Sequence, residues 1–311
     1  MTTSPFDWYD RELRKYPVPY QARMVETEFG PTHVLISGDR EADPLVLLHG
    51  RGDTALVWIK FIAQFSAHFR TYAIDLPGYP GKSVARRLAS SGSGAADWLA
   101  QALSGLGVGA AHVVGASLGG WMALKFAVTY PGRVSRLALL VPMGIVRPQF
   151  RNFFPHVLPL LLQGRRGQES LKQAMAVKPI DQAALDLAAE TARYQKWFTV
   201  VYPFVIPDDA LRRLTMPVLM VVGATDFWCD PSALIARVRR TIPQARIEQL
   251  AECDHLILND QPELTMQAIL TFLEREEKGG SRFQAEPNAA ADGGRDPGFS
   301  EFQGSQRGRR C

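Results

Sequence analysis

Short apolar runs alternate along the chain with longer segments in which apolar residues recur every three or four positions. The short runs predict strands at residues 23–29, 32–38, 44–50, 70–78, 111–117, 136–142, 217–226 and 245–251. The longer segments predict helices at residues 55–69, 95–106, 121–130, 232–242 and 262–276. Runs as continuously apolar as "LVLL" are typical of strands buried on both faces. The alternation therefore predicts an α/β fold with a mainly parallel sheet flanked by helices. The first two predicted strands are expected to form an antiparallel hairpin.

Two segments interrupt this alternation. Residues 143–213 lie between two predicted strands, are too long for a simple crossover, and are rich in aromatic residues, Leu and Pro. We expect them to form an inserted helical cap within a domain that spans residues 1–278. Residues 279–311 contain no Val, Ile, Leu or Met and so have little apolar surface to bury. They predict a disordered tail.

Composition and charge narrow the class of protein. The 311 residues are 46% hydrophobic and 21% charged, which is typical of a globular chain with a large core. The formal net charge is +4, but Lys and Arg are interleaved with acidic residues, so we expect no nucleic-acid partner. The sequence carries no indication of oligomeric state.

The cysteines and the N-terminal sequence indicate the cellular compartment in which the protein is expected. Cys229, Cys253 and Cys311 are odd in number and lack the spacing of a zinc site or a redox pair. The N-terminus lacks the basic start and apolar run of a signal peptide, and no window reaches the roughly 18 apolar residues of a membrane span. We expect a cytoplasmic protein with free thiols and no membrane partner.

Ser117 lies in "HVVGASLGGWMALKF", where an apolar strand turns into a helix. A sharp turn there places the hydroxyl at the carboxyl edge of the sheet, beside the free N–H groups of the first helical turn. Such a strained turn needs small neighbours, which explains Gly115 and Gly119. The five-residue pattern alone leaves open a serine that merely caps the helix.

Two further motifs follow predicted strands, as Ser117 does. "LLHGRGD" ends the preceding strand in "HG", and "DLPGYPGKS" follows the next one. Together with "GASLGG", in this order and spacing, they resemble the α/β-hydrolase fold superfamily over roughly residues 25 to 276. Within that superfamily the chain is similar to bacterial serine carboxylesterases.

The resemblance implies a catalytic triad in the order Ser, Asp, His. His255 in "AECDHLILNDQPE" follows the last predicted strand, as the family base does, and Asp226 ends the preceding strand in the family's G-x-x-D pattern. Asp230 stands four residues later, before a proline, where a helix cap is the alternative interpretation. Asp254 occupies a position at which the family often has Gly, and it leaves the effective pKa of the base open.

The implied chemistry is acyl transfer to water through an acyl-enzyme. The backbone N–H groups of Leu118 and Arg51 are the expected oxyanion donors, and no metal or organic cofactor is required. We expect hydrolysis of small-molecule esters with short to medium acyl chains. Two alternatives stay open: the same triad acting on a lactone, a carbon–carbon bond or in peracid formation, and a non-catalytic small-molecule-binding protein on this fold.

Overall fold

The computed structural model describes residues 6–84, 86, 88–156, 162, 165–193 and 204–274. In this part of the chain, eight strands form one sheet in the order β1-β2-β4-β3-β5-β6-β7-β8. They are β1 (Tyr20–Val25), β2 (Thr32–Ser37), β3 (Pro44–Leu48), β4 (Arg70–Ile74), β5 (Ala111–Ala116), β6 (Val134–Leu140), β7 (Val218–Gly223) and β8 (Arg246–Leu250). The strand β2 pairs antiparallel with β1 and β4, and the remaining pairs are parallel. The predicted hairpin and the mainly parallel sheet are confirmed.

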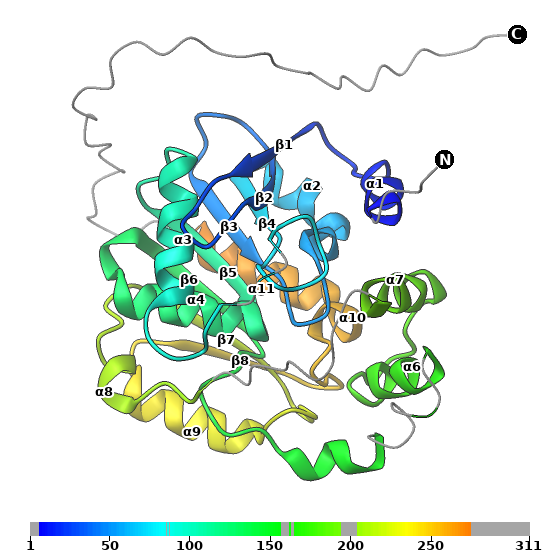
Figure 1. Ribbon diagram of the computed structural model, residues 1–311. Helices are drawn as coiled ribbons and strands as arrows, with labels where there is room; N and C mark the ends of the chain where they lie inside the picture. The colour runs from blue at the N-terminus through cyan, green and yellow to red at the C-terminus, as the bar shows by residue number, and fades with distance from the viewer. Residues whose placement is uncertain are drawn as a thin grey trace, which may run out of the picture. The chain divides into compact units, whose positions relative to one another are not determined.

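The sheet is buried on both faces by helices (Figure 1). One face packs against α3 (Gly94–Gly105), α4 (Leu118–Thr129) and α9 (Pro231–Thr241). The other packs against α1 (Asp7–Leu13), α2 (Ile62–Ser66) and α11 (Pro262–Leu273). The near-continuous apolar sequences follow from this arrangement, because alternate side chains of one strand enter opposite cores. In β3, for example, Val46 belongs to the first core and Leu47 to the second.

The helix predicted over residues 55–69 is two separate elements. A 3-10 helix, η1 (Ala55–Lys60), precedes α2, and the break falls at Phe61. The Phe61 amide bonds to the Trp58 carbonyl, an i→i+3 contact that tightens the turn. Buried Trp58, Phe61 and Phe65 all enter the same core, so both elements turn their apolar residues to the same face of the sheet.

Between β6 and β7 the described residues form η3 (Phe150–Phe153), α6 (Arg165–Ala174), α7 (Gln182–Arg193) and α8 (Asp208–Leu211). The remaining elements are η2 (Pro131–Arg133), before β6, and α10 (Ile257–Asp260), after β8. Helices within residues 143–213 were expected from the sequence. The expected tail at residues 279–311 lies outside the described residues.

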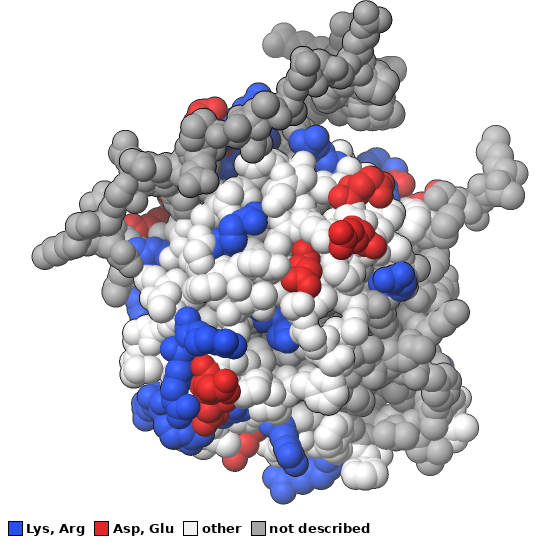
Figure 2. Space-filling model, turned by 60° about the vertical axis from the view of Figure 1, so that its left-hand side comes forward, with Lys and Arg blue, Asp and Glu red and all other residues white. Residues whose placement is uncertain are grey.

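Charged side chains are mixed over the face shown in Figure 2, where the densest group of Lys and Arg surrounds acidic residues. Among the ion pairs of the described residues, Asp208 pairs with Arg237 at 2.6 Å and with Arg240 at 3.0 Å. Among the described helices, none has both the length and the apolar character that crossing a bilayer requires.

Candidate active site

Ser117 lies in the turn between β5 and α4, with φ of 50° and ψ of −109°. A non-glycine residue with positive φ is strained, and the surroundings must hold it in place. The close packing here admits no side chain at the flanking glycines. A Cβ added at Gly115 would lie 2.5 Å from the Gly119 carbonyl oxygen, and one at Gly119 would lie 2.4 Å from the Leu48 carbonyl oxygen. The turn therefore has the geometry of a nucleophile elbow, in which both glycines are sterically required.

The structure brings the three predicted triad residues together. Ser117 Oγ lies 2.8 Å from His255 Nε2, and His255 Nδ1 lies 3.0 and 3.1 Å from the two carboxylate oxygens of Asp226. Asp226 follows β7, and His255 lies in the loop between β8 and α10. Parallel strands end at the same edge of the sheet. Asp226 and His255, which come 109 and 138 positions after Ser117 in the sequence, therefore meet it at that edge. All three residues are buried.

The acid loop holds its carboxylate with backbone amides. Trp228 N and Cys229 N donate to Asp226 Oδ1 at 2.7 and 3.2 Å. Trp228 also packs its ring against the His255 imidazole, with centroids 6.0 Å apart. Asp230 faces elsewhere: its side chain caps α9 by accepting bonds from Ser232 N and Ala233 N. Of these two acids, Asp226 is the one that hydrogen-bonds His255.

The loop after β3 lies against the elbow. Leu76 N donates to His49 Nε2 at 2.9 Å, so the proton of the neutral ring is on Nδ1, which donates to the Gly50 carbonyl at 2.8 Å. Burial lowers the pKa of His49 and so favours this neutral form. In a planar trans peptide the Arg51 N–H points away from the Gly50 oxygen. The imidazole therefore fixes the direction of the amide predicted as an oxyanion donor.

The other predicted oxyanion donor, Leu118 N, is in the first turn of α4, where helical N–H groups have no intrahelical acceptor. The two donor loops are adjacent, since a Cβ built on Gly50 would lie 3.7 Å from Ser117 Cβ.

A family model described as the alpha/beta hydrolase family matches residues 45–268, which include the elbow, Asp226 and His255. This chain belongs to the alpha/beta hydrolase family. Carboxylesterase YbfK of Bacillus subtilis (strain 168) is 30% identical over 275 residues, covering 85% of this chain and 92% of that protein. The uncharacterized carboxylesterase nap of the same strain is 27% identical, covering 87% and 92%. The crystal structure of naproxen esterase from Bacillus subtilis matches with a TM-score of 0.79 at 27% identity, covering 87% of this chain and 97% of that chain.

His255, the predicted base, has several carboxylates near it. Burial on its own lowers the pKa of His255, but the charge and hydrogen bond of Asp226, followed by the charges of Asp254 and Asp53, outweigh it. The net pKa is therefore raised from its ordinary value of 6.5. Burial also raises the pKa of the Asp254 carboxyl, against the effect of the two amides that donate to it.

One buried carboxylate was missed by the sequence analysis. Asp75, in the "DLPG" motif, accepts from Ala55 N at 2.8 Å and from Lys82 N at 3.0 Å, and bonds His33 Nδ1 at 2.8 Å. Burial raises the pKa of Asp75, but His33 and the other partners lower it by more. Asp75 thus ties η1 to the loop after β4. The sequence predicted a strand over residues 70–78, whereas β4 ends at Ile74, and nothing local in the motif indicated these partners.

Residues of the 143–213 segment contact the site loops. Lys172 of α6 lies 3.5 Å from Asp53, two residues after Arg51, and Leu256 N donates to the Met175 carbonyl at 2.9 Å. Asn152 Nδ2 donates to the Phe227 carbonyl of the acid loop at 2.6 Å.

The aromatic residues of that segment do not all pack inward. Phe150, Phe154 and Phe204 are 50%, 75% and 64% exposed. Trp197, Phe198 and Tyr202, which also contribute to the aromatic content of the sequence, lie outside the described residues.

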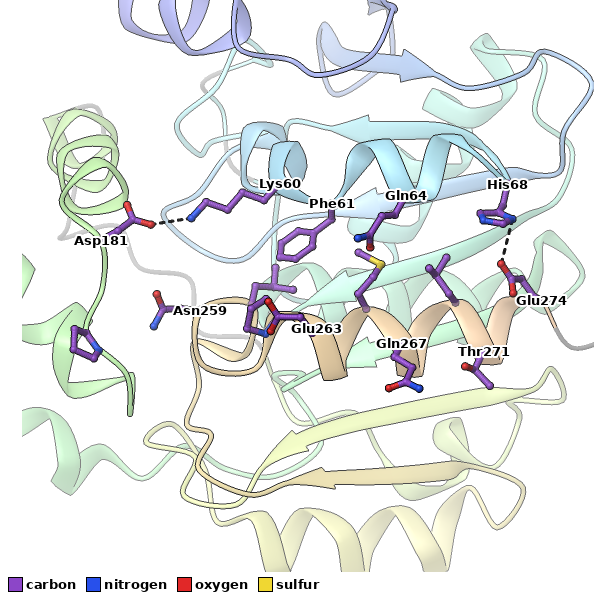
Figure 3. Close-up of a pocket in the computed structure, with 15 residues that line it drawn as sticks. Lys60, Phe61, Gln64, His68, Asp181, Asn259, Glu263, Gln267, Thr271 and Glu274 are labelled. Atoms are coloured by element: carbon purple, nitrogen blue, oxygen red, sulfur yellow. Dashed lines mark hydrogen bonds and ion pairs between the residues drawn. The ribbon is translucent and has the colours of Figure 1, made fainter.

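A cavity of about 800 Å³ lies between α2 and α11, as Figure 3 shows. Ion pairs between Lys60 and Asp181, at 2.8 Å, and between His68 and Glu274, at 3.2 Å, stand at its two ends. None of its lining residues is Ser117, Asp226 or His255. This cavity is separate from the candidate active site.

Proposed function

We propose that this alpha/beta hydrolase is a serine carboxylesterase that cleaves esters of short to medium acyl chains through an acyl-enzyme. The observation that carries the proposal is the continuous contact from Ser117 Oγ through His255 to Asp226. Two relatives named carboxylesterase, which match 85% and 87% of this chain, support ester hydrolysis as the reaction. A pure binding protein would need a pocket but no nucleophile in contact with a base.

Acylation begins at the elbow. His255 Nε2 takes the proton from Ser117 Oγ as that oxygen attacks the ester carbonyl, and Asp226 stabilises the resulting imidazolium. Because Trp228 N and Cys229 N already donate to Asp226, the carboxylate remains oriented toward Nδ1 throughout. The electron pair of the carbonyl moves onto its oxygen and forms the oxyanion of a tetrahedral intermediate.

The oxyanion is held by the amides of Leu118 and Arg51. The first belongs to the start of α4, where the helix dipole adds to the stabilisation of negative charge. The second is aimed by the bond between His49 and the Gly50 carbonyl. Because both donors are main-chain groups, the Arg51 side chain is not needed for this role.

Collapse of the intermediate breaks the ester C–O bond, and His255 gives its proton to the leaving alcohol. Deacylation repeats the cycle with water: His255 removes a proton from water, hydroxide attacks the acyl carbonyl, and Ser117 Oγ leaves and regains the proton. The products are a carboxylic acid and an alcohol. These steps use side chains, amides and water alone.

We propose further that residues 143–213 act as a cap on the 1–278 domain and help to select the substrate. The contacts of Lys172 with Asp53 and of Met175 with Leu256 support a position beside the oxyanion and base loops. A cytoplasmic location is also proposed, and the buried, unbridged thiols of Cys229 and Cys253 fit reducing surroundings.

A panel of p-nitrophenyl esters of graded chain length, with a lactone and a dienoate beside them, tests the reaction. The proposal expects turnover of the esters and labelling of Ser117 by a fluorophosphonate. Turnover of the lactone or the dienoate without any ester would favour the alternative chemistry. Neither turnover nor labelling would favour a binding role.

A further inference from the structure

Asp260, the last residue of α10, is a fully buried carboxylate placed between two segments far apart in the sequence. Its Oδ2 accepts from Val177 N at 2.9 Å, and its Oδ1 accepts from Lys178 N at 3.1 Å. Both donors follow α6 in the 143–213 segment. The same Oδ2 accepts from Asp254 N at 2.8 Å. Asp260 therefore joins that segment to the loop that carries the base.

Asp254 continues the chain of hydrogen bonds. Its Oδ1 accepts from His255 N and from Phe227 N, both at 2.6 Å. Phe227 directly follows Asp226, so a single oxygen holds the backbone of the base and the backbone beside the acid. The connection runs without a break from residues 177 and 178 through Asp260 and Asp254 to both loops of the triad.

The hydrogen bonds of Asp254 and Asp260 fix how several backbone segments lie relative to one another. A buried carboxylate such as that of Asp260 is costly unless its oxygens are hydrogen-bonded, and the backbone donors to Asp260 and to half-buried Asp254 must meet in one register. The base loop is also pressed against the end of β7, since a Cβ on Gly223 would lie 2.5 Å from the carbonyl oxygens of Cys253 and Asp254. The contact with Gly223 holds the His255 loop on one side. We expect loss of either carboxylate to let the opposite side of this loop move.

We propose that Asp254 and Asp260 are positioning residues that hold the His255 loop in register with the Asp226 loop and with residues 177 and 178. This inference rests on the proposed function, because the register matters for catalysis only if His255 is the base of Ser117. It adds two residues that act through the backbone of the loops carrying His255 and Asp226.

The first test compares Asp254→Ala with a matched control, Asp230→Ala. Each change removes a carboxylate that accepts from two backbone amides, but Asp230 caps α9 and does not contact the base loop. We expect kcat for a p-nitrophenyl ester to fall on the order of 10²-fold in Asp254→Ala, as for a misplaced catalytic group. KM should change far less, and Asp230→Ala should lose only stability.

A second variant, Asp254→Asn, keeps an acceptor oxygen and removes the charge. The charged groups that face His255 are Asp226, Asp254 and Asp53, and all three raise its pKa. The acidic limb of kcat/KM should therefore move to lower pH. The histidine titration should move equally in NMR spectra recorded in a Ser117→Ala background, where no turnover is needed.

The third test is a double-mutant cycle between Asp254→Ala and Asp260→Asn. Asn at position 260 replaces one acceptor oxygen by an NH₂ group, which cannot accept the amides that now bind there. If the two carboxylates act as one unit, the double variant should be about as slow as the slower single variant. The corresponding cycle with Asp230→Ala should be additive.

The outcomes separate this inference from the proposed function. Equal effects of Asp254→Ala and Asp230→Ala on kcat, or an additive first cycle, would overturn the positioning role while leaving the esterase intact. A loss of kcat on the order of 10²-fold in Asp254→Asn at its pH optimum would also overturn it, even if Asp254→Ala failed to fold, because this variant keeps the oxygen that accepts both amides. Absence of ester turnover and of fluorophosphonate labelling in the unmutated protein would instead remove the proposed function.

Discussion

The Ser117 amide donates a hydrogen bond to the Leu140 carbonyl, 2.8 Å away at the end of β6. The Ser117 carbonyl in turn accepts from Trp121 N in α4 and from Met143 N after β6, both at 3.1 Å. The strained backbone of the elbow is thus held by main-chain contacts on both sides. None of these contacts uses the hydroxyl, which leaves it available to His255.

Ser117→Ala should therefore fold normally and lose catalysis. Alanine retains the Cβ and every main-chain bond of the elbow, so the free energy of unfolding should change little. The loss of kcat should be on the order of 10⁶-fold, as when a triad nucleophile is removed. Thermal unfolding and ester hydrolysis on the same preparation measure both quantities. Retention of most of the activity would mean that another residue attacks the ester.

Mutation of Asp226 and of Asp230, the two acidic residues after β7, should lower kcat to very different extents. Asp226→Asn should lower kcat by ~10⁴-fold, because the amide favours the wrong histidine tautomer and cannot stabilise the imidazolium. Asp230→Asn should cost little activity, since that side chain only caps α9. Steady-state kinetics of the two variants against the unmutated protein make the comparison. A larger loss in the position 230 variant would reverse the assignment of the acid.

The activity should fall on the acidic side at a pH above 6.5. The pKa of His255 is raised from 6.5, and only the neutral ring can accept the Ser117 proton. For the same reason, the contribution of His255 to stability is complete below 6.5 and is lost as pH rises through the folded-state pKa. A profile of kcat/KM against pH checks the first statement. An inflection at or below 6.5 would contradict the dominance of the surrounding carboxylates.

How far the sequence predicts this protein can be judged from particular residues. Ser117 and Asp226 each follow a continuously apolar run, and His255 follows the more polar run "ARIEQLA", so local patterns place all three at the carboxyl edge of the sheet. Their assignment as a triad came from the resemblance to a family. The glycines of the elbow were explained by the same local geometry. Asp230 as a helix cap was also readable, because its proline neighbour is a local signal.

Long-range contacts between polar groups were not predictable in this way. Asp260 is bonded to Val177, 83 positions earlier, and Asp75 to His33, 42 positions earlier. Neither partner follows from periodicity, since a buried carboxylate and an exposed one look alike in a sequence. Asp254 was noticed only as a departure from a family pattern, and its two amide donors became visible only in the structure.

His112, on β5, should make the fold sensitive to acid. Burial, with a smaller contribution from the charge of Arg136, lowers its pKa from 6.5 to about 4, so the folded protein keeps it neutral where the unfolded chain binds a proton. Stability should therefore decrease as pH falls from 6.5 to about 4, by about 3 kcal/mol. Urea unfolding across this range should show a flatter pH dependence in His112→Gln. His68→Gln, at a half-exposed histidine, is the control, and equal slopes would refute the argument.

Acyl chain length should separate this hydrolase from enzymes that act at lipid surfaces. Ser117, Asp226 and His255 are 8%, 4% and 5% exposed, and the Lys172–Asp53 pair joins α6 to the loop that carries Arg51, a predicted oxyanion donor. A long, flexible acyl chain needs a wide entrance, and a site this enclosed favours smaller neutral esters. We expect kcat/KM to be highest for short to medium p-nitrophenyl esters, with no increase when the substrate concentration passes its solubility limit. Preference for long-chain emulsions would show that the segment opens far more widely than these contacts suggest.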